Sequence, residues 1–106
     1  MIIVTQCVII LIMIKSFADK ETERVFNREL SRKLPADIQR AARRKMEILN
    51  AAQTLQDLRN PPANRLEKLI GLRKHQHSIR INDQWRLCFV WKGTDAEAVE
   101  IVDYHN

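Results

Sequence analysis

The chain has 106 residues, which is enough for one domain with a hydrophobic core and too few for two. Hydrophobic residues make up 45% and charged residues 29%, with only two glycines and three prolines, so the composition excludes a disordered or fibrous protein. Eighteen lysines and arginines against thirteen acidic residues give a net charge of +5, which favours polyanions as partners. Cys7 and Cys88 have no metal-binding or redox spacing, so we expect no disulfide and a reducing, cytoplasmic compartment.

The N-terminal segment is unusually apolar and reads MIIVTQCVIILIMI. It is shorter than the roughly 20 apolar residues of a membrane-spanning helix, and it lacks the basic start and small-residue cleavage site of a signal peptide. We therefore expect no membrane association. Met13 is a second plausible start of the protein. We expect one domain over residues 13–106. Residues 1–12 are then either an N-terminal extension or the result of a start codon assigned too early.

The first half predicts a short strand and two helices. Residues 14–17 alternate as a strand does, and Ala18-Asp19 is a helix-start signal. A helix over residues 19–31 is expected to bury one stripe of side chains, formed by Val25, Phe26 and Leu30.

Pro35 then suits the first turn of a second helix, because its missing N–H would be unbonded there. This helix, over residues 36–52, keeps an apolar period through Ile38, Ala42, Met46 and Leu49. Its polar face is expected to be solvated, or to contact RNA or a partner, and it carries Arg40, Arg43, Arg44 and Lys45.

The second half predicts an antiparallel sheet. After a further helical turn at residues 54–58 and a non-helical connection at 60–64, residues 77–81 and 85–91 alternate as the strands of a hairpin. A turn at residues 92–95 precedes a last strand at 98–104. The expected class is α+β, with the helical hairpin packed on one face of the sheet.

Alternation separates the two faces of this sheet. Ile79 and Ile81 belong to the core face together with Trp85, Leu87, Phe89 and Trp91, whereas Ser78, Arg80, Arg86, Cys88 and Val90 belong to the other. Guanidinium groups on an open face can bind phosphate bidentately. We therefore expect this surface to bind RNA through Arg65, Lys68, Arg73, Lys74, His75 and Arg80.

RNA cleavage requires no metal or cofactor, because side chains alone can supply a base, a cation and an acid. Tyr104 and His105 are titratable candidates directly after the last strand. The alternatives are a base-stacking role for Tyr104 and a frayed terminal position for His105. His75-x-His77 is too weak a pattern to predict a metal site, since no cysteine or carboxylate ligand follows at a recognisable spacing.

Three segments resemble a known family: PANRL at residues 62–66, QHSIRINDQWRLCF at 76–89 and VEIVDYH at 99–105. The chain from Met13 to His105 resembles HigB toxins, the plasmid-maintenance killer proteins of the RelE/ParE superfamily. The resemblance implies a RelE-like fold, with an N-terminal strand and two-helix hairpin on an antiparallel sheet. It also implies a cytoplasmic endoribonuclease that cleaves mRNA in the ribosomal A site, without a cofactor, and a HigA-type helix-turn-helix antitoxin as partner.

By the same resemblance, Arg86 matches the family's phosphate-stabilising arginine, and Asp103, Tyr104 and His105 match C-terminal positions tied to activity. The sequence departs from the family at Glu67 and Ile70, where some members have a histidine and a lysine. Either His77 or His105 is then the general base, or catalysis relies more on positioning by the ribosome and on charge stabilisation. Two alternatives to an endoribonuclease are a non-catalytic inhibitor of a protein such as gyrase and a plain RNA-binding module.

Overall fold

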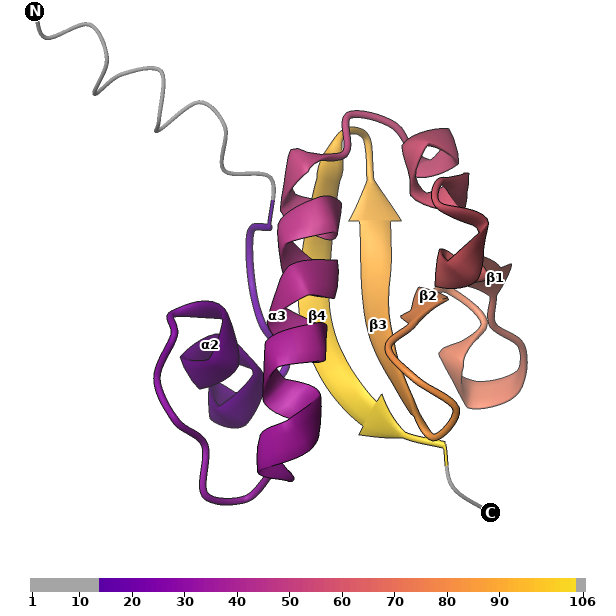
Figure 1. Ribbon diagram of the computed structural model, residues 1–106. Coiled ribbons are helices and arrows are strands. Elements are labelled where there is room, and N and C mark those ends of the chain that lie inside the picture. Colours follow the sequence, from indigo (N-terminus) through magenta and orange to yellow (C-terminus); the bar gives the residue numbers. More distant parts are fainter. Residues whose placement is uncertain (1–13, 105–106) are drawn as a thin grey trace, which may run out of the picture.

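The computed structural model describes residues 14–104, so the expectation for the extension at residues 1–12 and the position of His105 lie outside the described residues. Figure 1 shows two helices lying on one face of a twisted sheet. The helices are α2 (Lys20–Phe26) and α3 (Ala36–Ala51), and the strands are β1 (Glu67–Lys68), β2 (His77–Arg80), β3 (Trp85–Lys92) and β4 (Asp95–Asp103). Short 3-10 helices occur at Leu55–Arg59, Pro62–Asn64 and Gly71–Arg73. The predicted α+β class is confirmed.

The strands form an antiparallel meander in the order β1-β2-β3-β4. The predicted N-terminal strand is present only as an extended segment that runs parallel to β4, with isolated bridges from Ile14 to Ala96 and from Phe17 to Val99. Backbone hydrogen bonds from Lys15 N to Ala96 O (2.8 Å) and from Ala18 N to Val99 O (2.9 Å) hold it there. This segment covers the outer edge of β4.

Helix α2 is shorter than predicted. It begins after Asp19, whose carboxylate accepts a hydrogen bond from Thr22 N, and it ends at Phe26. Arg28 has a positive φ of 66°, which interrupts the helical backbone. The prediction that Leu30 lies in the buried stripe was wrong, because the stripe ends with the helix and Leu30 is 72% exposed.

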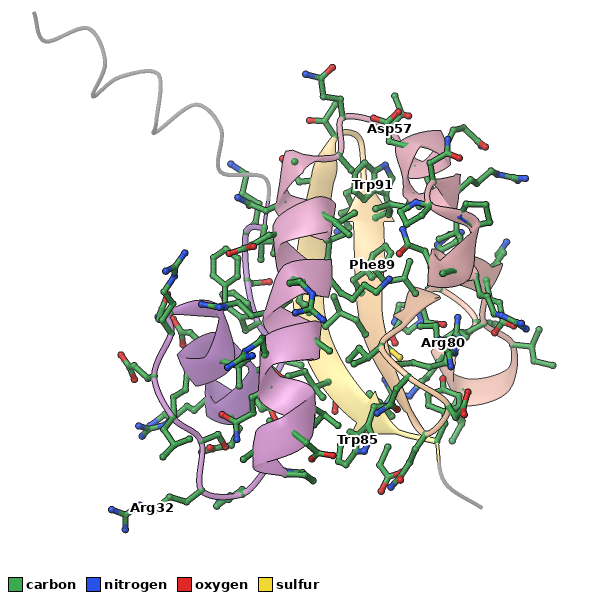
Figure 2. The ribbon with its side chains drawn as sticks, in the orientation of Figure 1. Arg32, Asp57, Arg80, Trp85, Phe89 and Trp91 are labelled. Carbon is green, nitrogen blue, oxygen red and sulfur yellow. The ribbon has the colours of Figure 1, made fainter. Side chains whose placement is uncertain are left out.

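Helix α3 follows the prediction closely, ending at Ala51 instead of residue 52. All four residues of its predicted apolar stripe are buried, and they pack with Ile79, Leu87, Phe89, Val99 and Ile101 of the sheet. Figure 2 shows Phe89 and Trp91 along β3 beside α3, with Trp85 near the other end of the strand. The hydrophobic core therefore lies between α3 and one face of the sheet, which leaves the opposite face for other contacts.

The segment between α3 and β1 is more ordered than the sequence indicated. The predicted helical turn is the 3-10 helix Leu55–Arg59, closed by a reciprocal capping box between Thr54 and Asp57.

Within residues 14–104, no helix combines the length and the apolar character needed to cross a bilayer.

Candidate nucleic-acid interface

The predicted separation of the sheet into two faces is confirmed by the strand register. Ile79 pairs with Leu87 on the face that contributes to the core. Ser78 pairs with Cys88, and Arg80 pairs with Arg86, on the opposite face, which we call the site face.

Arg86 is held on the site face by neutral acceptors. Its Nε donates to Ser78 Oγ (2.7 Å), and its NH2 group donates to the carbonyl oxygen of Arg65 (2.6 Å) and, more weakly, to that of Ser78 (3.4 Å). The nearest carboxylate, that of Glu67, lies 3.7 Å away and is itself exposed. Only 11% of the Arg86 side chain is exposed. The guanidinium is therefore fixed in orientation while its charge is only weakly compensated.

The Arg65 carbonyl is positioned by the connection that precedes β1. Arg65 has a left-handed backbone (φ 46°) at the end of the 3-10 helix Pro62–Asn64. The buried Asn64 amide donates to the carbonyl oxygens of Leu58 (3.1 Å) and Asn60 (3.2 Å) and accepts from Lys45 Nζ (2.6 Å). Burial, and then the nearby positive charges of Arg80 and Arg44, lower the pKa of Lys45. Asn64 thus connects helix α3 to the backbone that orients Arg86.

Tyr104 lies on the same face, directly after β4. Its hydroxyl is 3.7 Å from Cys88 Sγ, and its backbone N–H donates to Gln84 O (2.6 Å). Burial and the contact with Cys88 raise the pKa of Tyr104, whereas the positive charges of Arg73 and Arg86 act in the other direction. Burial likewise raises the pKa of the Cys88 thiol. The phenol is therefore protonated at neutral pH and is able to donate a proton.

The segment between β1 and β2 brings a second guanidinium to this face. Arg73 NH1 donates to Gln76 Oε1 (3.0 Å) and to Glu100 Oε1 (3.1 Å). Glu100 is the register partner of Cys88, so this contact places Arg73 over the middle of the site face. The structure therefore gathers Arg73, Arg86 and Tyr104 around Cys88.

His77 lies on the other face of the sheet. It pairs with Phe89, and the two rings stack with their centroids 6.4 Å apart. Its Nδ1 is buried and has no hydrogen-bond partner among the described residues. Burial, and then the charge of Lys68, lower the pKa of His77. Lys68 pairs with His77 and shares its face, so neither residue lies beside Arg86 and Tyr104.

The remaining predicted residues surround the site less closely. The Arg80 guanidinium forms an ion pair with Asp83, and the Asp103 carboxylate accepts a hydrogen bond from the Gln84 amide (3.1 Å). Among the predicted residues, four are exposed along the β1–β2 side of the sheet: Arg65, Lys68, Lys74 and His75. Within residues 14–104, no group of three histidine, cysteine or acidic side chains is arranged to hold a metal ion.

Three contributors to the site were not predicted from the sequence: the Ser78 hydroxyl, the Arg65 carbonyl and the Glu100 carboxylate. Alternation already placed Ser78 on the face of Arg86, so its role as an acceptor was accessible from the pattern. The contacts of Arg65 and Glu100 depend on the path of the chain between residues 60 and 76, for which no periodic signal exists.

The sequence of the chain matches a known protein family. A model for the RelE-like toxin of the type II toxin-antitoxin system HigB matches residues 15–105. Toxin HigB-1 of Vibrio cholerae serotype O1 is 46% identical over 80 residues, which cover 74% of this chain and 84% of that protein. An uncharacterized protein of Haemophilus influenzae is 35% identical over 63 residues, which cover 59% of this chain and 62% of its own length.

Proposed function

Because this chain belongs to the HigB family of RelE-like toxins of type II toxin-antitoxin systems, we propose that it is a ribosome-dependent mRNA endonuclease that blocks translation. The observation that carries the proposal is the Arg86 guanidinium, which neutral acceptors fix on a face shared with Tyr104. A fixed cation beside a proton donor is the arrangement that phosphodiester cleavage requires.

The proposed reaction is attack by the ribose 2′-oxygen on the adjacent phosphorus. A base removes the proton from the 2′-OH, a bond forms between the 2′-oxygen and phosphorus, and the bond from phosphorus to the 5′-oxygen breaks. Arg86 stabilises the charge that accumulates on the phosphate oxygens in the transition state. The leaving 5′-oxygen takes a proton, and the other product is a 2′,3′-cyclic phosphate. No metal or cofactor takes part.

We assign the acid to Tyr104, since its phenol is protonated at neutral pH and lies on the Arg86 face. The base is assigned to the C-terminal segment, with Asp103 and His105 on either side of Tyr104 in sequence. The position of His77 on the opposite face supports this choice over a base in β2. The basic residues Arg65, Arg73, Lys74, His75 and Arg80 are proposed to bind RNA, whereas the position of Lys68 on the face of His77 argues against that role for it.

The proposed partners are mRNA in the ribosomal A site and a HigA-type helix-turn-helix antitoxin, with the cytoplasm as the compartment. A toxin that cleaves the message of its own host requires such an inhibitor. Co-expression with the product of a neighbouring helix-turn-helix reading frame should restore growth.

Induced expression with mapping of RNA 5′ ends tests the proposal. Wild type should arrest growth and create new 5′ ends within translated messages. Arg86→Gln should abolish both effects, whereas Arg59→Gln, which removes one charge from an exposed position, should retain them. Growth arrest with intact messages and damaged DNA would identify a gyrase inhibitor instead. Intact messages with salt-sensitive RNA binding would identify a binding module.

A further inference from the structure

Arg73 differs from Arg86 in the charge of its acceptor. Both hydrogen bonds of its guanidinium use the NH1 group, one to Gln76 and one to the Glu100 carboxylate. Its Nε and NH2 groups make no hydrogen bond to any described residue, and 36% of the side chain is exposed. Arg73 therefore keeps free donors on the site face, but a carboxylate of the chain itself compensates its charge.

The segment that carries Arg73 has backbone hydrogen bonds of its own, besides the contact with Glu100. The backbone bonds from Lys74 N to Gly71 O (3.1 Å), from Gln76 N to Arg73 O (2.8 Å) and from Leu69 N to Gln76 O (2.9 Å) fix its conformation. Gln76 Oε1 also accepts a hydrogen bond from the Arg73 guanidinium (3.0 Å). The ion pair therefore places a negative charge against an Arg73 guanidinium that the backbone and Gln76 also position.

We propose that Arg73 is a second phosphate-binding residue of the site and that Glu100 restrains it by competing with RNA phosphate for the guanidinium. This inference rests on the proposed function, because it assumes that RNA occupies the site face. The register supports it: Glu100 lies beside Cys88, and Cys88 contacts the Tyr104 hydroxyl, so a phosphate on Arg73 lies next to the proposed acid. Burial disfavours the charged form of Arg73, but the hydrogen bond and attraction of Glu100 outweigh it and raise the pKa.

Glu100→Gln provides a sharp test, since the amide keeps an oxygen acceptor for Arg73 and removes only the charge. The probe is a short fluorescein-labelled single-stranded RNA, with binding followed by anisotropy at several salt concentrations. Glu100→Gln should tighten binding about twofold to fivefold. It should also steepen the slope of log affinity against log salt concentration by up to about 0.7, the value for one added phosphate contact on a single strand. Arg73→Gln should weaken binding.

The double variant decides the mechanism. If Glu100 acts through Arg73, adding Glu100→Gln to Arg73→Gln should produce no gain in affinity. An equal gain in both backgrounds would mean that Glu100 repels RNA in general and would overturn the proposal, as would unchanged or weaker binding by the single Glu100→Gln variant. Glu47→Gln is the matched control, because Glu47 pairs with Arg28 on the helical layer, away from the site face. It should leave binding unchanged.

Cleavage of ribosome-bound message by the wild type is measured in parallel. Absence of cleavage would overturn the proposed function, whereas the affinity cycle reports on Arg73 and Glu100 alone. The two failures are therefore distinguishable.

Discussion

The hydroxyl of Tyr104 is the part of the site face best suited to donate a proton, and its removal leaves the ring in place. We expect Tyr104→Phe to reduce the single-turnover cleavage rate on ribosome-bound message by about 100-fold or more, a typical loss for a general acid. The midpoint of thermal unfolding should change little, because the substitution removes only a long contact of the hydroxyl with Cys88 Sγ (3.7 Å) and keeps the ring. A rate equal to that of wild type would remove Tyr104 from the chemistry.

The pH dependence follows from the direction of the pKa shift at this residue. Burial and Cys88 raise the pKa of Tyr104, so the acid form persists throughout the neutral range. The cleavage rate of wild type should therefore not decline between about pH 6 and pH 8 through loss of this proton. A rate that falls in step with phenol ionisation in that range would contradict the assignment.

His77 should affect stability instead of catalysis. Its folded-state pKa is lowered from 6.5 by burial and by Lys68, so the folded protein binds the proton less readily than the unfolded chain. The contribution of neutral His77 to the free energy of unfolding is therefore fully present above the unfolded pKa. It is lost as the pH falls through 6.5 toward the lower pKa of the folded state. His77→Phe, which can still stack on Phe89, should flatten the decline of the unfolding midpoint in acid and retain cleavage activity. Loss of cleavage with normal stability would restore His77 as a candidate base.

At the scale of elements, the connection between α3 and β1 links the core to the site. Asn64→Ala removes the amide that binds the carbonyls of Leu58 and Asn60 and the ammonium of Lys45. Leaving such buried groups unpaired costs about 1–3 kcal/mol, so urea unfolding should show a loss of that order. Cleavage by the folded fraction should also fall, because Arg65 and hence Arg86 lose their positioning. Gln56→Ala, at an exposed position of the same connection, should change neither quantity.

How well each element could be predicted depends on whether its signal is periodic. The four apolar side chains of α3 recur over several turns, and all four are buried as expected. Helix α2 has a comparable pattern, but the left-handed backbone at Arg28 ended it before Leu30, and no residue type marked that position in advance. Strands β2 and β3 were predicted nearly to their ends, whereas the two-residue β1 and the 3-10 helices are too short to show a period.

The same distinction applies to the site. Alternation correctly placed Arg80 and Arg86 on one face, because a strand has a fixed period of two. The same period of two puts His77 on the face of Ile79. The Arg73–Glu100 contact joins residues 27 positions apart through an irregular segment, so only the folded chain brings them together.

At the scale of the whole molecule, the sheet divides a helical layer that supplies the core from a site face that carries the proposed chemistry. Positive charge occurs on both: Arg40 and Arg44 on α3, and Arg80 and Arg86 on the sheet. Net charge alone therefore does not locate the proposed RNA-binding surface. Because three hydrogen bonds fix the Arg86 guanidinium, the phosphate binding proposed for it requires little further ordering.

A matched pair of double variants tests which layer of the molecule binds RNA, as proposed for the site face. Arg80→Gln with Arg86→Gln, and Arg40→Gln with Arg44→Gln, each remove two charges from a net charge of +5. Titration of a labelled single-stranded RNA at several salt concentrations should show that the sheet variant loses affinity and that its salt slope becomes shallower by about 0.7 for each lost contact. The helix variant should retain the slope of wild type, because α3 lies on the other side of the sheet (Figure 1). Circular dichroism should show that both variants are folded. Equal losses in both would show that RNA responds to total charge, and a larger loss in the helix variant would place the interface on α3.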